Sequence, residues 1–498
     1  MAPIFVGSNS DDTRIRSNRV GLAASTADPG SASEGDIYYN STNNQVKTYD
    51  GSSWSAIQGS GTVELEASGS LSNGQTVIIQ SDGTVKAVTA TTQGPNGGTS
   101  TVFDDDYGAN SIDVAYASSN KIVVVYKQFV HPNYYGHAVV GTISSGTISF
   151  GNPVQYNSIN SNYNTVVYDP DSDKVVVIWK DANGVGGRAA VGTITGTSIS
   201  FGTAATFESG NPKYISAVYD TSEDRVVIAY EDDSNSDYGT AVVGTVSGTS
   251  ISFGTAVVFE SAAVQHISAC FDSDNNKVII AYQDGGNSFA GTAIVGTVNS
   301  TSISFGSPVT FNGTSSSYIA AAYDTNAQKV IIAFNNASAS PVTGAAVHMT
   351  VSGTSLTGTS AAPAFNSSPS PYISAVYNPL EKHTVIFWND QTISQSFSAS
   401  VVPNGETVSY GATALIHSTD AQHLASSFDT DNNRVILAFQ DSAVSGDPGR
   451  ALVWNSGITT TTNVTTENFI GFSDAAYSDG DTANIQIISS IDDAQSGL

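Results

Sequence analysis

The sequence predicts an all-β fold, and its composition and a long internal repeat are the observations behind this prediction. Of the 498 residues, 40% are apolar and only 12% are charged, and 46 glycines accompany runs of Ser, Thr and Asn. Short Val- and Ile-rich segments separated by such residues favour β-strands and tight turns over helices. A chain of this length can form two to four domains, each with its own hydrophobic core.

The repeat is a unit of 51 to 54 residues that occurs seven times. Each copy contains an aromatic residue that is usually followed by Asp, and this aromatic residue marks the same position in every copy. Repeats of this length are typical of propellers and solenoids. The seven markers are Tyr116, Tyr168, Tyr219, Phe271, Tyr323, Tyr377 and Phe428.

Each copy contains four short β-type segments, which we number first to fourth. In the third copy they are residues 214–220, 225–231, 240–246 and 250–259, separated by turn-forming residues. Four strands per unit and no helical period predict a β-propeller, because each blade then buries its two faces against its neighbours.

The two ends of the repeat array predict a closed ring. The array begins with a fourth-type strand at 99–103 that has no unit before it, and it ends with three strands that lack a fourth. Together these fragments complete one blade, which removes the free sheet edges. We therefore predict a seven-bladed β-propeller at 99–456, with four-stranded blades and a split closing blade in which a strand near residue 100 pairs with one near residue 452.

The flanking segments resemble parts of phage structural proteins. Residues 15–59 contain EGDIYYNSTNNQVKTYDGSSW, a hairpin-like pattern with turn residues at 41–44 and 50–51, and resemble a short strand module of many phage tail-fibre and tail-associated proteins. Segments 69–89 and 467–498 are similar to successive pieces of one fibre module in tailed-phage proteins. The resemblance implies a tail-fibre or other virion structural protein.

This resemblance also implies a domain organisation. Residues 1–62 would form an N-terminal anchoring module, and 63–98 and 457–498 would be the two halves of a split β-rich stalk domain. The propeller would be inserted between the halves, which is tolerated where the termini of the inserted domain lie together. It further implies a homotrimer on the tail or particle surface, with residues 1–98 and 457–498 contacting other virion proteins.

Charge argues against two classes of partner. Lys plus Arg number 17 and Asp plus Glu number 44, which gives a net charge of −27. Nucleic acid and anionic membranes are therefore poor partners. We expect no membrane insertion, because no apolar run approaches 18 residues. Cys270 is the only cysteine, so an intrachain disulfide is impossible.

The two ends of the predicted blades differ in how closely their turns repeat. The first-to-second turns are near copies of one another, as at 169–174 and 272–277, and so are most third-to-fourth turns; we call this end the uniform face. The second-to-third connections differ in length and composition, and we call their end the varied face. The stalk connections near Gly98 and Gly457 should leave from the uniform face, so the varied face should point outward, as in an adhesin. The varied connections are 127–138, 180–188, 231–240, 283–292 and 440–450.

Aromatic residues on the varied face are our candidate ligand-binding residues. Aromatic planes stack on sugar rings or peptide side chains at low entropic cost. The alternative is that these rings only hold their own loops in place. Six further aromatic residues begin the first strands, where they could line the channel mouth, although their recurrence favours packing between blades. The ligand-binding candidates are Phe129, His131, Tyr134, Tyr135, His137, Tyr238 and Phe289, and the first-strand residues are Tyr163, Tyr214, His266, Tyr318, Tyr372 and His423.

No catalytic residue, metal site or cofactor is predicted. The acidic first-to-second turns have part of a calcium-loop pattern, but the sixth-position Gly and closing Glu are missing, which favours hairpin turns with Asx contacts. The segment Asn235-x-Asp237-x-Gly239 falls short of the box typical of sialidase propellers.

We therefore expect a non-catalytic virion adhesin whose propeller binds a host cell-surface receptor or glycan. Two alternatives of other classes remain open. One is a capsid- or tail-decorating protein without a receptor role, and the other is a tailspike-like enzyme that degrades glycans.

Overall fold

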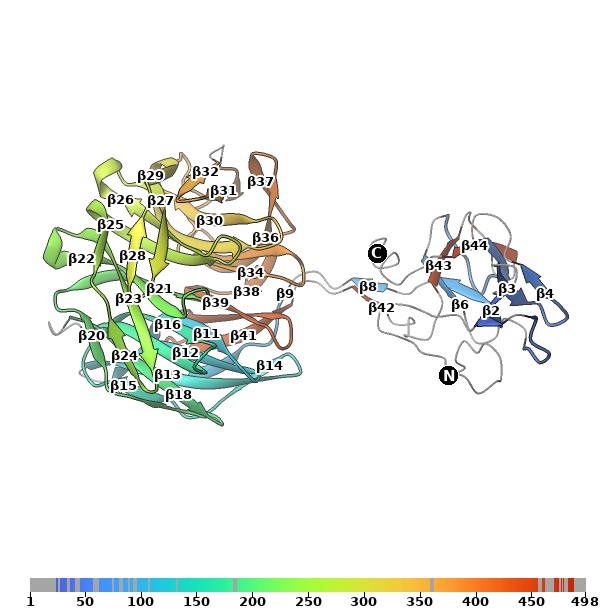
Figure 1. Cartoon of the computed structure of the whole chain (residues 1–498), viewed down its shortest axis with the longest axis horizontal. Coiled ribbons are helices and arrows are strands. Elements are labelled where there is room, and N and C mark those ends of the chain that lie inside the picture. The colour runs from blue at the N-terminus through green and yellow to red at the C-terminus, as the bar shows by residue number, and fades with distance from the viewer. Residues whose placement is uncertain are drawn as a thin grey trace. The chain divides into compact units, whose positions relative to one another are not determined.

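The structure of the chain is a computed structural model that divides into two compact units, Met1–Gln93 with Gly457–Leu498, and Gly94–Ser456 (Figure 1). Among the described residues every element is a β-strand except two 3₁₀ turns, η1 (Asp233–Asn235) and η2 (Gly285–Asn287). The predicted all-β class is confirmed. The structure describes residues 24–25, 27–33, 36–40, 45–56, 62–73, 76–79, 84–87, 90–92, 96–105, 108–130, 133–181, 186–358, 362–455, 459–461, 470–473, 476, 478 and 482–487.

The unit Gly94–Ser456 contains antiparallel sheets in which first, second and third strands follow one another in chain order (Figure 1). The second strands are buried on both sides, which explains their continuous Val and Ile runs. The first strands are β11 (Ala109–Ala117), β16 (Ser161–Asp169), β21 (Pro212–Asp220), the second parts of β25 (Val257–Asp272) and β29 (Val309–Asp324), β34 (Ser374–Asn378) and β39 (Ala421–Asp429). The second strands are β12 (Lys121–Val130), β17 (Lys174–Asp181), β22 (Arg225–Asp232), β26 (Lys277–Asp284), β30 (Lys329–Asn336), β35 (His383–Asp390) and β40 (Arg434–Asp441). The third strands are β13 (Asn133–Ser144), β18 (Gly186–Thr195), β23 (Tyr238–Ser247), β27 (Ala290–Asn299), β31 (Thr343–Ser352), β36 (Gln395–Asn404) and β41 (Gly449–Asn455).

The fourth position differs from the prediction of one strand, because it consists of two short pieces that both pair with the third strand. The pieces separate after a Phe-Gly or similar dipeptide, where a Cβ on Gly202 would lie 1.9 Å from the carbonyl oxygen of Thr249 in the next repeat. In β25 and β29 the second piece continues into the next first strand, which joins three repeats in one sheet. The pieces are β14 (Thr147–Phe150) and β15 (Val154–Asn157), β19 (Ser198–Phe201) and β20 (Ala205–Glu208), β24 (Ser250–Phe253) and β25, β28 (Ser302–Phe305) and β29, β32 (Ser355–Thr357) and β33 (Ala364–Asn366), and β37 (Thr407–Tyr410) and β38 (Ala414–His417).

The last third strand receives its partners from the beginning of the unit. Strands β9 (Asn96–Gly97) and β10 (Thr101–Asp104) both pair antiparallel with β41, with Thr101 opposite Ala451. The predicted pairing between segments near residues 100 and 452 is confirmed. The Phe103 ring also lies over Gly449, where a Cβ would approach it to 2.3 Å, as the Phe207 ring lies over Gly187 within one repeat.

The hydrophobic cores of this unit lie between successive repeats. One core packs Val227 and Val243 of the third repeat against Ile280 and Ile294 of the fourth. Burial of such a side chain contributes about 1.5–3 kcal/mol. Another core combines residues of the first and last repeats, namely Ile122, Val124, Ile436 and Val453, with Phe103 of β10.

The uniform face is held by hydrogen bonds of the acidic turns. Asp169 Oδ1 accepts a hydrogen bond from the backbone N–H of Asp171 at 3.1 Å, which confirms the predicted Asx contacts. The marker Tyr219 donates from its hydroxyl to Asp171 Oδ2 of the preceding repeat at 2.7 Å, and Tyr323 donates to Asp274 in the same way. The markers Tyr219 and Tyr323 therefore each connect two neighbouring repeats, whereas Tyr168 donates to Asp173 of its own repeat.

The other unit contains two sheets. The first confirms the predicted hairpin pattern, because its second and third strands pair antiparallel and Asp50 accepts the backbone N–H of Ser52 in the next turn. The second combines strands from both sides of the repeat array, as a split domain requires. The first sheet is β1 (Ala24–Ser25), β2 (Ile37–Asn40), β3 (Gln45–Tyr49) and β4 (Trp54–Ala56), the second is β5 (Thr62–Glu66), β44 (Thr482–Ile487), β43 (Ile470–Ser473), β6 (Thr76–Ile79) and β7 (Val85–Ala87), and β8 (Ala90–Thr92) pairs with β42 (Thr459–Thr461).

Candidate functional site

Six aromatic residues at the varied-face end of the first strands share an unusual backbone conformation. Their φ angles lie between 48° and 54°, in the left-handed region that residues with a Cβ rarely adopt. In the third repeat the ladder shifts register between Lys213 and Ser216, which identifies a β-bulge. A bulge redirects a side chain out of the regular alternation of a strand. The six residues are Tyr163, Tyr214, His266, Tyr318, Tyr372 and His423.

These six rings form a continuous chain across six repeats, which we call the aromatic arc. The centroids of successive rings are 5.0 to 5.5 Å apart. Ser111 occupies the equivalent position in the first repeat, with φ of 50°, and interrupts the arc there. The rings thus pack between repeats, as expected, but each also remains partly exposed. Burial lowers the pKa of His266 and of His423 to about 4, so both rings are neutral at pH 7.

A pocket of about 340 Å³ lies beside Tyr318 and Tyr372 of the arc. Its remaining lining comes from the varied-face ends of three repeats and is mostly amide, carboxylate and proline. Such a mixture offers rings for stacking and polar atoms that can bind hydroxyl groups. The lining residues are Tyr318, Asn335, Pro369, Pro371, Tyr372, Asn389, Gln391, Ser394, Asp420 and Gln422.

The polar side chains of the pocket hold one another in place. Asp420 Oδ1 accepts from Asn389 at 2.8 Å, and its Oδ2 accepts from Gln422 at 2.7 Å and from Ser442 at 2.6 Å. Tyr372 in turn donates to Gln422 Oε1 at 3.1 Å. The network therefore fixes the amide groups, and three donors occupy most of the roughly four acceptor positions of the Asp420 carboxylate.

A polar residue follows a buried aromatic residue near the end of every second strand, and our sequence reasoning missed this pattern. Two of these residues, Asn335 and Asn389, line the pocket, and their constant spacing in the repeat was the signal that could have revealed it. Because they occupy the same register in each repeat, they belong to one end of the sheets. The seven residues are Lys127, Lys180, Glu231, Gln283, Asn335, Asn389 and Gln440.

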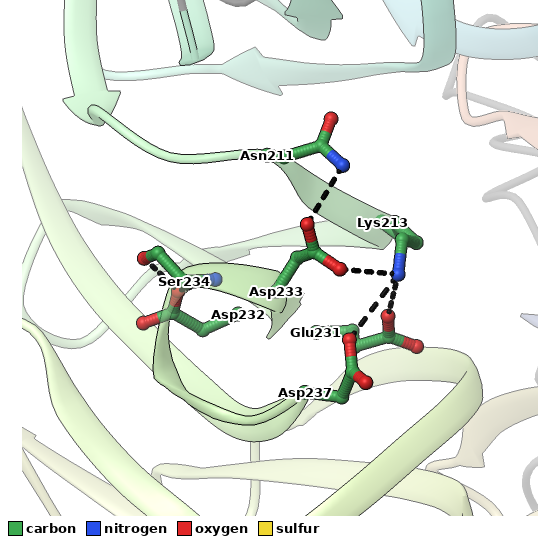
Figure 2. Close-up of polar contacts among 7 residues, drawn as sticks. All are labelled: Asn211, Lys213, Glu231, Asp232, Asp233, Ser234 and Asp237. Carbon is green, nitrogen blue, oxygen red and sulfur yellow. Dashed lines mark hydrogen bonds and ion pairs between the residues drawn. The ribbon is translucent and has the colours of Figure 1, made fainter.

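A cluster of charged residues surrounds Lys213 in the third repeat (Figure 2), and Lys213 directly precedes Tyr214 of the arc in the sequence. Figure 2 shows the Lys213 ammonium among three carboxylates, at 2.7 Å from Glu231, 2.8 Å from Asp233 and 3.2 Å from Asp237. Although burial disfavours the charged ammonium, these partners raise the pKa of Lys213 above its ordinary value. Burial raises the pKa of Glu231 to about 7 despite Lys213, whereas hydrogen bonds from Lys213 and Asn211 lower the pKa of Asp233 to about 2.

The three carboxylates of this cluster offer oxygen atoms within 4.8 Å of one another, a spacing that could hold a metal ion. The Lys213 ammonium already bonds to all three, however, and neutralises one of their negative charges. We therefore interpret the cluster as an ion-pair network.

The predicted loop 127–138 is a β-hairpin, because β12 and β13 pair up to Val130 and Asn133. His131 lies outside the described residues, and Tyr135 is half-buried on β13. The structure brings Phe129 and Tyr134 together, with ring centroids 4.6 Å apart.

The other predicted residues have different surroundings. His137 is only 8% exposed and stacks on Tyr126 at 5.9 Å, and burial lowers its pKa. Tyr238 is half-buried at the start of β23, whereas Phe289 is 48% exposed in the fourth repeat. Neither Tyr238 nor Phe289 has a ring contact with another described aromatic residue. Ligand binding by the seven predicted residues stays a prediction.

Comparisons with known proteins yield structural likenesses only. No protein-family model and no curated protein matches this chain. A protein of unknown function from Dyadobacter fermentans is 12% identical, with 72% of this chain and 98% of that chain covered and a TM-score of 0.44. A protein from Lactobacillus plantarum is 10% identical, with 69% and 97% covered and a TM-score of 0.45. The β-propeller domain of the Trilobed protease from Pyrococcus furiosus is 7% identical, with 72% and 100% covered and a TM-score of 0.42.

Among the described residues there is also no helix long and apolar enough to cross a lipid bilayer.

Proposed function

We propose that residues 99–456 form a closed seven-bladed β-propeller whose varied face recognises a ligand. Three observations support closure. Strand β10 pairs with β41, Phe103 covers Gly449 as Phe207 covers Gly187, and one core combines the first and last repeats. A closed ring has no free sheet edge and holds the first strands around one axis.

We further propose that the protein is a non-catalytic adhesin of a virion, a tail fibre or tail-associated protein that binds a host cell-surface glycan or receptor. The observation that carries the recognition role is the pocket beside Tyr318 and Tyr372, with its fixed amide groups. Partly exposed rings next to prearranged polar groups suit a saccharide, which stacks its apolar face and hydrogen-bonds through its hydroxyl groups. The virion role rests on the resemblance of the flanking segments.

The pocket geometry favours binding over glycan cleavage. Glycoside hydrolysis commonly requires two carboxyl groups on opposite sides of the scissile bond. Asp420 is the one carboxylate that lines the pocket, and three hydrogen-bond donors hold it. The acids near Lys213 are paired with that ammonium. A decorating protein without a receptor role would not need the pocket, so the effect of removing the pocket rings distinguishes the two functions.

Competition with host adsorption tests this proposal. Purified full-length protein should block particle adsorption to host cells, and the double variant Tyr318→Ala, Tyr372→Ala should block it at least tenfold less well, because both aromatic rings are lost. Leu380→Ala serves as the control, since Leu380 is an exposed apolar residue of a uniform-face turn. If the pocket variant competes as well as the wild type while remaining folded, recognition does not occur at this pocket.

A further inference from the structure

Lysine residues are concentrated on one sector of the varied face, which is notable in a chain with a net charge of −27. Lys127 and Lys180 occupy equivalent positions in the first two repeats, directly after the buried rings of Tyr126 and Trp179. Lys213 lies in the third repeat and directly precedes Tyr214 of the arc in the sequence. Later repeats carry Gln or Asn where Lys127 and Lys180 stand.

These lysines differ in how their charges are balanced. Lys213 bonds to three carboxylates, as described above. Lys127 instead donates to the amide oxygen of Asn162 at 2.7 Å and lies 4.6 Å from the Tyr134 ring centroid. Lys180 lies 5.7 Å from the Tyr163 ring centroid. Among the described residues neither ammonium has a carboxylate within 4.0 Å.

Lys127 and Lys180 belong to one site because both adjoin Asn162. Asn162 accepts the hydrogen bond from Lys127, and it lies opposite Lys180 in the ladder between β16 and β17. The next residue is Tyr163, the end of the aromatic arc. His423 is the arc residue on the other side of the interruption at Ser111, and its pKa is lowered mainly by burial and further by the Lys127 charge. We call Lys127, Asn162, Tyr163 and Lys180 the cationic sector.

Retaining two partly buried ammonium groups without an ion pair is unfavourable for folding alone. Both side chains are half-buried, and desolvation disfavours an ammonium that lacks a compensating charge. An anionic ligand would supply that charge, and charge-assisted hydrogen bonds to a carboxylate are stronger than neutral ones. Glu231 and Asp233 favour the charged form of Lys180 from a longer distance, but among the described residues no carboxylate forms an ion pair with either ammonium group.

We propose that the cationic sector binds the carboxylate of an acidic saccharide, whose sugar rings stack along the aromatic arc. This inference rests on the proposed recognition function and names its ligand class. Lys127 and Lys180 bind the carboxylate, Asn162 orients Lys127, and Tyr163 contacts the sugar ring that carries the acid group.

The test uses two forms of one saccharide, an oligosaccharide of alternating glucuronate and N-acetylglucosamine and the same chain with its carboxyl groups reduced to alcohols. Calorimetry with the full chain should give a dissociation constant at least tenfold lower for the acidic form. Lys127→Gln and Lys180→Gln should each weaken binding of the acidic form by about tenfold and binding of the reduced form much less, because Gln keeps a hydrogen-bond donor but removes the charge.

Lys174→Gln is the matched control, since it removes the same charge from a uniform-face turn and should change neither affinity. Equal affinity for both saccharide forms, or full affinity of the double lysine variant, would overturn the proposal while leaving pocket recognition intact. Absence of binding of the acidic form also overturns it. Failure of the recognition function itself is seen separately, as an unchanged adsorption result for the Tyr318 and Tyr372 variant.

Discussion

The uniform and varied faces are two ends of the same strands, yet their side chains have different tasks. At the uniform face the same bond recurs between repeats, as Tyr219 with Asp171 and Tyr323 with Asp274 show. At the varied face the residue near the end of each second strand changes from Lys to Glu, Gln or Asn. One end therefore repeats a structural interaction, while the other presents different chemistry from repeat to repeat.

This difference shows how side chains of a repeat array can vary between repeats while the fold is kept. The aromatic arc is nearly constant and packs successive repeats together at the varied face. The polar residues around it therefore do not need to provide that packing and can differ between repeats. The pocket and the cationic sector both lie beside the arc but differ in chemistry, one rich in amide groups and the other in ammonium groups.

The largest expected effect concerns acid stability of the varied face. Because the pKa of His266 and His423 is about 4 in the folded chain and about 6.5 when unfolded, the unfolded state takes up protons first. Their contribution is therefore fully present above pH 6.5 and is lost as the pH falls toward 4, by on the order of 3 kcal/mol for each histidine. The double variant His266→Tyr, His423→Tyr places at these positions the residue that the other arc positions carry. Its melting temperature should fall less between pH 7 and pH 4.5 than that of the wild type.

Acidic pH also weakens the carboxylate hydrogen bonds of the uniform face, so the comparison between variant and wild type isolates the arc. Identical pH dependence of the two melting temperatures would show that the arc histidines are not held neutral by burial.

The next effect tests whether both faces depend on ring closure. Gly449→Ala places a methyl group against the Phe103 ring, as Gly239→Ala does against the Phe259 ring within one repeat. Each should destabilise the protein by about 2 kcal/mol in urea unfolding, because packed cores tolerate added volume poorly. Gly313→Ala is the control, since nothing lies within 4 Å of its added Cβ. A much smaller effect at Gly449 than at Gly239 would contradict closure by β10.

The smallest effect concerns the uniform face alone. Tyr219→Phe removes the hydroxyl that donates to Asp171 and should cost about 1 kcal/mol of unfolding free energy. Tyr377→Phe changes the equivalent marker, whose hydroxyl has no hydrogen bond among the described residues, and should change stability little. Both variants should keep the saccharide affinity of the wild type. Reduced affinity in Tyr219→Phe would show that the two faces are coupled.

Some features of the candidate site could be predicted from the sequence and others could not. The arc residues were recognisable because they recur at one position before each marker. The loop 127–138 was misinterpreted, since its aromatic and β-branched residues form strands that extend the hairpin to Val130 and Asn133. Burial of His137 followed from the same pairing, because residues inside a ladder lie against neighbouring strands.

The sequence by itself determined the all-β class, the seven repeats, the Asx turns and the pairing of residues near 100 with residues near 452. Strand alternation and turn formation depend on residues close together in the chain, so a repeat displays them many times. Only the tertiary structure decided where Tyr318, Asn389 and Asp420 meet and which lysines lack an ion pair. The residues that meet in this way belong to different repeats, and the packing between the sheets determines where they meet.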